Sequence, residues 1–119
     1  MKKILIVEDH IDIRKLLKMT LEFDDFEIHE AATGDAGWVL AQELQPDIVL
    51  LDVMMPGVDG YETARRLKAD PATASVPVIL LTARVGGDPA ADVAVGVIAK
   101  PFDPMNLAGQ VRSILGWPS

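Results

Sequence analysis

Four short apolar runs are spread along this chain of 119 residues, and a polar side chain follows each of them at once. The runs at 4–7, 48–51 and 78–81 are apolar at every position, as strands buried on both faces of a parallel sheet must be. Segments with helical periodicity separate the runs, and this alternation is typical of βαβ units. The sequence therefore predicts an α/β fold whose parallel sheet includes these runs and a fourth at 97–99.

The side chains that follow the runs carry oxygen and nitrogen groups. Glu8 and Asp9 follow the first run, and Asp52, Thr82 and Lys100 follow the others in order. In an open parallel sheet, groups just beyond the carboxyl ends of the strands line one crevice. We therefore expect three carboxylates, one hydroxyl and one ammonium to meet there, which is the composition of a site for a divalent metal and a phosphoryl group.

Each of these side chains has a chemical role in such a site. Asp9 and Asp52, supported by Glu8, offer the hard oxygen ligands that Mg²⁺ prefers, and a bound metal would offset the negative charge that an incoming phosphoryl group meets. Asp52 can act as the nucleophile and form an acyl phosphate, because a carboxylate needs no base to activate it. Thr82 can donate its hydroxyl to a phosphoryl oxygen, and Lys100 can place a positive charge beside another.

Apolar spacing and capping residues predict the helices between the runs. The second helix should begin near Thr33 and end before Pro46, and the third should span about 61–69. The last should be capped by Asp103 and end at Gly116. The first helix should carry a stripe of buried residues, namely Ile13, Leu16, Leu17, Thr20 and Leu21.

Three segments are predicted to differ from this regular pattern. Residues 26–31 alternate between apolar and polar, which favours a half-exposed edge strand. Gly37 lies inside the second predicted helix and costs up to ~1 kcal/mol relative to alanine, so this helix should be the softer one. Between Thr82 and Lys100 only 89–95 can form a helix, which should be short or mobile because of the Gly and Pro residues before it.

Composition excludes several classes of protein. The chain has no cysteine, so it has neither disulfides nor a thiol or cysteine-based zinc site, and its two histidines, His10 and His29, are too few for a histidine-rich metal site. The net charge of −7 argues against nucleic acid as a partner of this chain, since phosphate backbones are bound by Lys and Arg. No run approaches the ~18 apolar residues of a membrane span, and no signal-peptide pattern is present, so we expect a cytoplasmic protein that does not bind membranes.

As a set, four motifs at this order and spacing resemble the receiver domains of bacterial two-component response regulators. The motifs are Val7-Glu8-Asp9, the segment 51–60, Leu81-Thr82-Ala83 and Lys100-Pro101-Phe102. The resemblance covers essentially the whole chain and implies one stand-alone receiver domain over residues 1–119. It also implies a doubly wound, flavodoxin-like sheet of five parallel strands in the order 2-1-3-4-5, with helices on both faces.

The resemblance implies a function as well. Asp52 would be the phosphoacceptor, loaded by a histidine kinase or a histidine phosphotransfer protein, and Thr82 and Lys100 would bind the phosphoryl group. The implied Mg²⁺ ligands are Glu8, Asp9, Asp52 and the backbone carbonyl of Met54. The chain would take part in its own phosphorylation and dephosphorylation without being an enzyme that acts on other substrates. It would signal by contact with a protein partner, whose identity the sequence does not give, or serve as a phosphoryl sink.

Two departures from the family pattern concern this output. The family usually has an aromatic residue three positions before the lysine, and here that residue is Val97. The segment from Thr82 to Lys100 is several residues shorter than is usual, and the deficit falls on the helix predicted at 89–95. Phosphorylation is therefore expected to follow the family pattern, whereas the output mechanism is expected to differ from it.

Two other functions remain as alternatives. A receiver-like docking module that works without phosphorylation is compatible with Val97 and the short helix, although the intact set of polar residues argues against it. A magnesium-dependent phosphohydrolase would also phosphorylate an aspartate at a strand end. Such enzymes usually carry a second acid two residues after the nucleophile, where this chain has Met54.

Several of the residues also have simpler structural interpretations. Glu8 and Asp9 could cap the helix that follows them, because acids favour helix N-termini. His10 is more readily a solvated residue at the helix start than a metal ligand or proton carrier. Trp38 should pack in the core or at its edge, and Trp117 should pack against the final helix.

Overall fold

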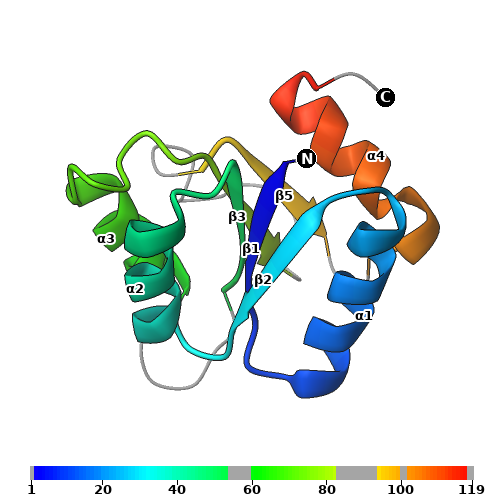
Figure 1. The fold of residues 1–119 in the computed structure, drawn as a ribbon, viewed down its shortest axis with the longest axis horizontal. Coiled ribbons are helices and arrows are strands. Elements are labelled where there is room, and N and C mark those ends of the chain that lie inside the picture. The colour runs from blue at the N-terminus through cyan, green and yellow to red at the C-terminus, as the bar shows by residue number, and fades with distance from the viewer. Residues whose placement is uncertain (1, 54–59, 83–93, 100–101, 118–119) are drawn as a thin grey trace.

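A single parallel sheet forms the centre of the molecule (Figure 1). The computed structural model describes residues 2–53, 60–82, 94–99 and 102–117. The strands run in the order β2-β1-β3-β4-β5, and every neighbouring pair is parallel. Their bounds are β1 (Lys3–Val7), β2 (Glu27–Ala31), β3 (Ile48–Asp52), β4 (Val78–Thr82) and β5 (Gly96–Ala99). The predicted fold class and strand order are confirmed.

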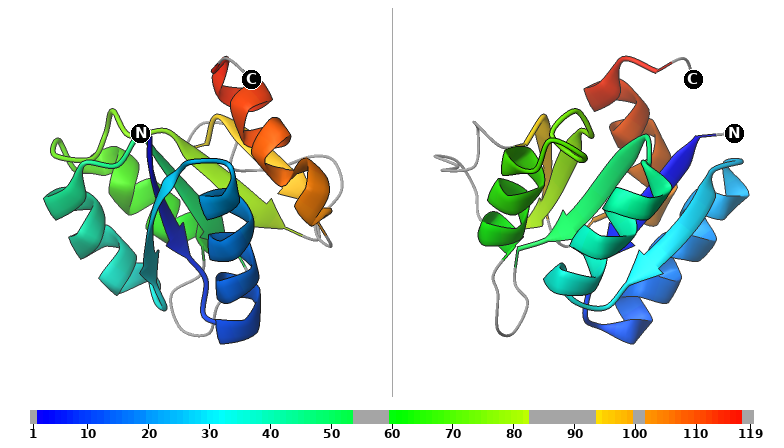
Figure 2. Two further views of the ribbon diagram at one scale, coloured as in Figure 1. Left: turned by 45° about the vertical axis from the view of Figure 1, so that its right-hand side comes forward. Right: turned by 60° about the vertical axis from the view of Figure 1, so that its left-hand side comes forward.

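Among the described residues, two helices cover each face of the sheet (Figures 1 and 2). The helices are α1 (Ile11–Phe23), α2 (Gly34–Leu44), α3 (Gly60–Ala69) and α4 (Pro104–Leu115). Helices α2 and α3 pack together on one face, and α1 and α4 pack together on the other. The short helix predicted at 89–95 falls mainly on residues 83–93, which lie outside the described residues.

The core consists of two apolar layers, one on each face of the sheet. Alternate residues of a strand point to opposite faces, so Leu5 and Val7 join the layer under α2 and α3, whereas Ile4 and Ile6 join the layer under α1 and α4. Strands β3 and β4 are buried at every position. Burial on both faces explains why these strands are continuous apolar runs in the sequence.

One residue of the predicted stripe on α1 was placed wrongly. Leu17 and Leu21 are fully buried and Ile13 is half-buried, as the helical spacing predicts. Leu16 is instead 40% exposed. It faces the start of α4 across an open groove, so the buried stripe of α1 is narrower than the spacing predicts.

The helix ends follow the capping signals in the sequence. The side chain of Thr33 accepts a hydrogen bond from Ala36 N–H at the start of α2, and that of Asp103 accepts one from Met105 N–H at the start of α4. Gly116 ends α4 in the left-handed conformation at φ 70°. Helix α1 is different, because its N-cap residue is His10 and that side chain makes no capping bond. The acids Glu8 and Asp9 therefore precede the helix rather than cap it.

The two tryptophans stabilise opposite sides of the fold. Trp38 packs against the core under α2 and α3, as predicted, and its Nε1–H donates to Asp70 Oδ2 over 3.0 Å. The N–H of Ala72, and then the side chains of Gln42 and Trp38, hold the pKa of Asp70 below its usual value. Trp117 follows α4 and lies 6.0 Å from Phe26, measured between ring centroids, so its ring packs beside the start of the edge strand β2.

The remaining sequence predictions on the fold concern exposure and close packing. Strand β2 is an edge strand and is half-buried at four of its five positions, as its alternating pattern predicts. Gly37 brings α2 close to β1, because a Cβ there would lie 2.6 Å from Val7 Cγ2.

Within the described ranges, no helix is long and apolar enough to cross a membrane.

Candidate functional site

The strand register brings the polar strand ends to the same edge of the sheet. Val7 is paired with Leu51, so the next residues, Glu8 and Asp52, follow side by side. Asp52 is in turn paired with Leu81, directly before Thr82. Glu8, Asp52 and Thr82 are all buried, whereas the Asp9 side chain is 26% exposed. The predicted convergence of these groups at the carboxyl edge is therefore present in the fold.

Two of the predicted site residues cannot be placed in this way. Lys100 and Met54 lie outside the described residues. The register still locates the end of β5, because Ala99, which precedes Lys100 in the sequence, is paired with Thr82. Val97 belongs to β5 and is 40% exposed, so no aromatic ring occupies this position of the edge strand.

The loop between β1 and α1 is held by three hydrogen bonds around Glu8. Its backbone N–H donates to the carbonyl of Ala31 over 3.0 Å, and its Oε2 accepts from His10 N–H over 3.2 Å. Its backbone carbonyl accepts from Arg14 Nη1 over 2.8 Å. These bonds fix the backbone that carries the first two acids of the site.

Arg14 is a residue that the sequence analysis did not single out. Its side chain is only 15% exposed, and its Nε lies 3.5 Å from Glu30 Oε1 on β2. Lys15 lies 3.7 Å from the other oxygen of Glu30. The guanidinium therefore joins the edge strand to the loop that carries Glu8. The sequence does show a basic residue one turn into the helix that follows the acids. A basic residue on a helix is usually solvated, however, so its position alone did not indicate a bond to the loop.

A close backbone approach determines where the chain returns to the sheet after Asp52. Gly60 begins α3, and its N–H donates to the carbonyl of Val53 over 3.3 Å. A Cβ at residue 60 would lie 2.5 Å from the carbonyl oxygen of Asp52, a distance that real side chains do not tolerate. The start of α3 can therefore lie directly against the end of β3 only because residue 60 is glycine.

The donor atoms at this edge fit a hard divalent cation. Glu8, Asp9 and Asp52 supply carboxylate oxygens, the ligands that Mg²⁺ prefers. Asp9 Oδ1 is shielded from solvent and has no hydrogen-bond partner among the residues described here. A buried carboxylate oxygen in that state is suited to a cation, because burial without a partner is costly.

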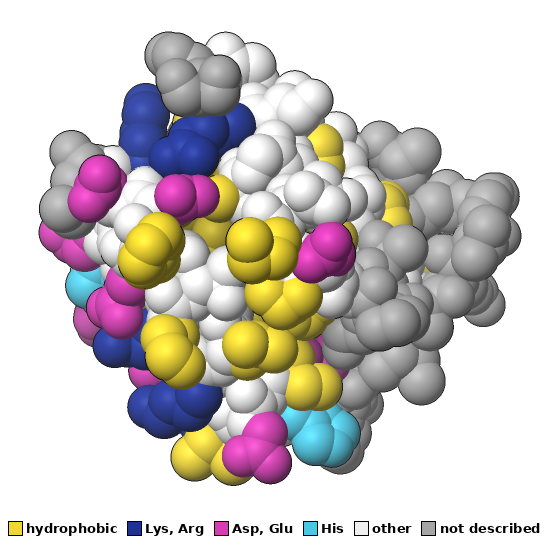
Figure 3. All heavy atoms as spheres, turned by 90° about the vertical axis from the view of Figure 1, so that its right-hand side faces the viewer, with side chains coloured by type: hydrophobic (Ala, Val, Ile, Leu, Met, Phe, Trp, Pro, Cys, Tyr) yellow, Lys and Arg dark blue, Asp and Glu magenta, His cyan; other side chains and the backbone are white. Residues whose placement is uncertain are grey.

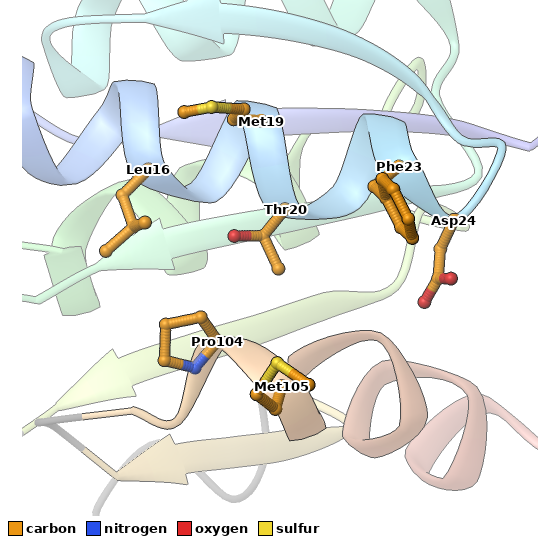
Figure 4. A pocket seen from close by; sticks show the side chains of 7 residues that line it. All are labelled: Leu16, Met19, Thr20, Phe23, Asp24, Pro104 and Met105. Atoms are coloured by element: carbon orange, nitrogen blue, oxygen red, sulfur yellow. The ribbon is translucent and has the colours of Figure 1, made fainter.

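An open apolar groove lies on the face covered by α1 and α4, between the second half of α1 and the start of α4. It encloses about 480 Å³ and is lined by Leu16, Met19, Thr20, Phe23, Asp24, Pro104 and Met105. Leu16, Thr20 and Phe23 point from α1 toward Pro104 and Met105 at the start of α4 (Figure 4). Exposed apolar side chains gather over the same face of the molecule (Figure 3). Met105 is 91% exposed and Met19 65% exposed. We call this surface the α1–α4 groove.

The chain is similar in sequence to bacterial regulatory proteins over nearly its whole length. RpaA of Synechocystis, a DNA-binding dual master transcriptional regulator, is 38% identical over 122 residues, which cover 97% of this chain and 49% of that protein. The chain thus spans about half the length of this curated relative.

Solved structures share the fold. The chemotaxis response regulator CheY4 of Vibrio cholerae superposes with a TM-score of 0.89 at 29% identity, covering 96% of this chain and 98% of that one. The receiver domain of the sensor histidine kinase PA1611 from Pseudomonas aeruginosa superposes with a TM-score of 0.86 at 27% identity, covering 97% and 98% of the two chains. That domain holds a magnesium ion in its active-site cleft.

The family profile agrees with these relatives. The profile of the response regulator receiver domain matches residues 4–112, a range that contains β2 to β5, all of β1 except Lys3, and both buried acids of the site. The sheet order and the convergent polar strand ends are those that the resemblance implied. The chain belongs to the response regulator receiver domain family and is a phosphoacceptor signalling module of the two-component type.

Proposed function

We propose that this chain, a single receiver domain over residues 1–119, accepts a phosphoryl group on Asp52 from a histidine kinase or a histidine phosphotransfer protein. The observation that carries the proposal is the burial of Asp52 between Glu8 and the Thr82 strand end at the carboxyl edge of the sheet. In the transfer, a carboxylate oxygen of Asp52 forms a bond to phosphorus. The bond from phosphorus to the donor's imidazole nitrogen breaks, and that nitrogen keeps the electron pair.

We assign the Mg²⁺ ligands to Glu8, Asp9, Asp52 and the backbone carbonyl of Met54. The cation would neutralise charge that develops on the phosphoryl oxygens during transfer. Glu8 and Asp9 are suited to this role because the bonds around the Glu8 backbone hold their loop in place before any ligand binds. The magnesium-loaded receiver domain of PA1611 supports the assignment at the level of the family.

Thr82 and Lys100 are assigned to the phosphoryl group itself. Thr82 ends β4 directly after Leu81, the partner of Asp52, and this position supports a role in which its hydroxyl would donate to a phosphoryl oxygen once Asp52 is modified. Lys100 directly follows Ala99, the partner of Thr82 in the sheet, and would supply a positive charge to another oxygen. The chain would thereby assist its own phosphorylation and dephosphorylation without acting on other substrates.

The α1–α4 groove is the proposed contact surface for the phosphodonor protein. Helix α1 begins two residues after Asp9, and α4 begins four residues after Lys100, so the two helices that line the groove both start next to the phosphoacceptor edge. A donor that brings its phosphohistidine to Asp52 must cover this neighbourhood. The exposed side chains of Leu16, Met19 and Met105 offer apolar surface that contact with an apolar helix face would bury.

Output from the phosphorylated domain would pass through contact with a protein partner, or the domain would serve as a phosphoryl sink. The exposed Val97 in β5 excludes a switch that works through an aromatic ring at that position. Within the described residues, nothing in the site favours a docking module that works without phosphorylation.

The experiment that tests this function measures the intact mass of the chain after incubation with acetyl phosphate. The expected result is a single phosphoryl adduct that requires Mg²⁺ and is absent from the Asp52→Asn variant. If a folded chain formed no adduct with acetyl phosphate and none with a histidine kinase or phosphotransfer donor, the phosphoacceptor role would be wrong. The docking module would then be the better interpretation.

A further inference from the structure

His10 is a potential nitrogen ligand beside the acids of the site. Its Nδ1 lies 3.8 Å from Asp9 Oδ1 and 4.0 Å from Glu8 Oε2. One ligand atom from each of Glu8, Asp9 and His10 falls within 4.8 Å of the other two. The three residues are consecutive in the sequence. Their ligand atoms lie close together because the backbone turns here from the end of β1 into α1.

These separations are close to those of ligands that share one metal ion. Two atoms bound about 2.1 Å from the same ion are about 3.0 Å apart when they are cis and about 4.2 Å apart when they are trans. The two measured separations lie inside that range. A small rotation of the imidazole would therefore place its Nδ1 on an ion held by the two carboxylates.

The imidazole is free to make that rotation. The His10 side chain is 71% exposed, and it makes no capping bond although His10 is the N-cap of α1. Its recorded charged neighbours are the two acids of the site. Asp9 Oδ1, the carboxylate oxygen nearer to the ring, is also the one without a hydrogen-bond partner in the described part of the chain.

A nitrogen donor changes which metal the site prefers. Mg²⁺ favours oxygen ligands and keeps much of its water, whereas imidazole suits Zn²⁺, Ni²⁺, Co²⁺ and Cu²⁺. A site of carboxylates alone already binds these borderline metals, but a direct imidazole ligand adds affinity for them and little for Mg²⁺.

We propose that His10 is a ligand that makes the acid site of this receiver domain selective for borderline divalent metals over Mg²⁺. The proposal rests on the proposed metal site at Glu8 and Asp9, and it adds a ligand to that site. In practice, Ni²⁺ or Zn²⁺ would compete with Mg²⁺ for the phosphoacceptor edge more strongly than the carboxylates alone predict.

The test is a pair of calorimetric titrations of the tag-free chain, with Ni²⁺ and with Mg²⁺, from which the ratio of the two affinities is taken. His10→Gln should lower the ratio of Ni²⁺ to Mg²⁺ affinity about 10-fold or more, since even an indirect partner of a metal ligand is worth that much. His29→Gln is the matched control, because His29 is the other histidine and its Nε2 is paired with Glu27 over 2.8 Å on β2. That variant should keep the ratio of the unmodified chain.

A second measurement tests direct ligation. On titration with Zn²⁺, the ring signals of His10 in a proton–nitrogen NMR spectrum should shift, and those of His29 should stay in place. An unchanged affinity ratio in His10→Gln, or ring signals of His10 that ignore Zn²⁺, would overturn the proposal and leave the proposed function intact. If Asp9→Asn weakened neither Mg²⁺ nor Ni²⁺ binding, the proposed metal site itself would be wrong.

Discussion

Arg14 donates a hydrogen bond from Nη1 to the backbone carbonyl of Glu8 over 2.8 Å. The same guanidinium contacts Glu30 on the neighbouring edge strand, so one side chain joins α1, β2 and the loop that carries the acids. The arrangement gives the loop a fixed position that does not depend on a bound cation.

Replacing Arg14 by leucine should therefore impair both stability and metal binding. Loss of a charged hydrogen-bond donor to a half-buried carbonyl is expected to cost about 1–3 kcal/mol in the free energy of unfolding. It should also weaken Mg²⁺ binding, because the acids would have to be ordered at the moment of binding. Urea denaturation and a Mg²⁺ titration would measure the two effects.

The matched control is Lys15→Leu. Lys15 is paired with Glu30 like Arg14, but its side chain is 59% exposed, whereas that of Arg14 is largely buried against the loop. If this variant weakened Mg²⁺ binding as much as Arg14→Leu does, the bond to Glu8 would not be the cause.

Thr82 can be tested with two variants that separate its shape from its hydroxyl. Thr82→Val keeps the buried volume and removes the hydroxyl, whereas Thr82→Ser keeps the hydroxyl. We expect the valine variant to be phosphorylated by acetyl phosphate at least about 10-fold more slowly, since one hydrogen bond to a charged group is worth about 1.5–3 kcal/mol. The serine variant should be phosphorylated at a rate closer to that of the unmodified chain. Time-resolved intact-mass measurements would give these rates. Equal rates in both variants would remove the hydroxyl from the mechanism.

The α1–α4 groove can be tested by placing a charge in it. Met19→Glu and Met105→Glu alter exposed side chains, so the fold should tolerate them. Transfer from a phosphorylated histidine donor should fall, because a carboxylate would have to be desolvated at the contact. Labelling by acetyl phosphate, which needs no protein contact, should be unchanged.

Val39→Glu is the control for this pair. Val39 is 45% exposed but lies on α2, on the opposite face of the sheet. Equal loss of donor transfer in all three variants would show that added negative charge, rather than the groove, is responsible.

Replacement by alanine should change the stability of the fold in opposite directions at two glycines. Gly60→Ala would push a Cβ against the Asp52 backbone, so we expect a loss of about 1–3 kcal/mol in stability and slower phosphorylation. Gly109 lies on the exposed side of α4 with nothing within 4 Å of its Cβ position. Gly109→Ala should stabilise the fold by about 0.5–1 kcal/mol. Thermal unfolding of the two variants gives both signs, and a stable, active Gly60→Ala would contradict the close approach.

The lowered pKa of Asp70 predicts that the free energy of unfolding depends on pH. Its pKa in the folded state lies below the ordinary value of 3.8, chiefly because Ala72 N–H donates to it. The unfolded chain therefore binds this proton first as the pH falls. The stabilisation is complete above pH 3.8 and is lost as the pH falls through the lower folded-state pKa.

Asp70→Asn should accordingly be less stable than the unmodified chain at neutral pH. Its single amide oxygen cannot accept both from Trp38 and Gln42, which donate to Oδ2, and from the Ala72 N–H, which donates to Oδ1. The difference in melting temperature should shrink below the ordinary pKa. A difference that stays constant down to the acid unfolding of both proteins would refute this account.

The strand ends could be predicted from the sequence because a run of buried apolar residues is followed there at once by a polar residue. Asp52 follows a fully buried run, and a parallel sheet leaves a polar group at that point only one edge to occupy. Capping residues such as Thr33 and Asp103 were equally readable, since their hydrogen bonds are local. The features that escaped depend on pairing across the fold. The bond from Arg14 to Glu8 is made by a long side chain with many possible partners, and the exposure of Leu16 depends on where α4 crosses α1.

The contact between Lys2 and Trp117 has a consequence for how the domain can be built into larger proteins. The Lys2 ammonium lies 5.0 Å from the centroid of the Trp117 ring, so the first and last described residues meet beside the start of β1. That is the amino edge of the sheet, opposite the edge with Asp52. A further domain joined at either end would attach at this amino edge and would leave the acid site at the opposite edge open to a partner.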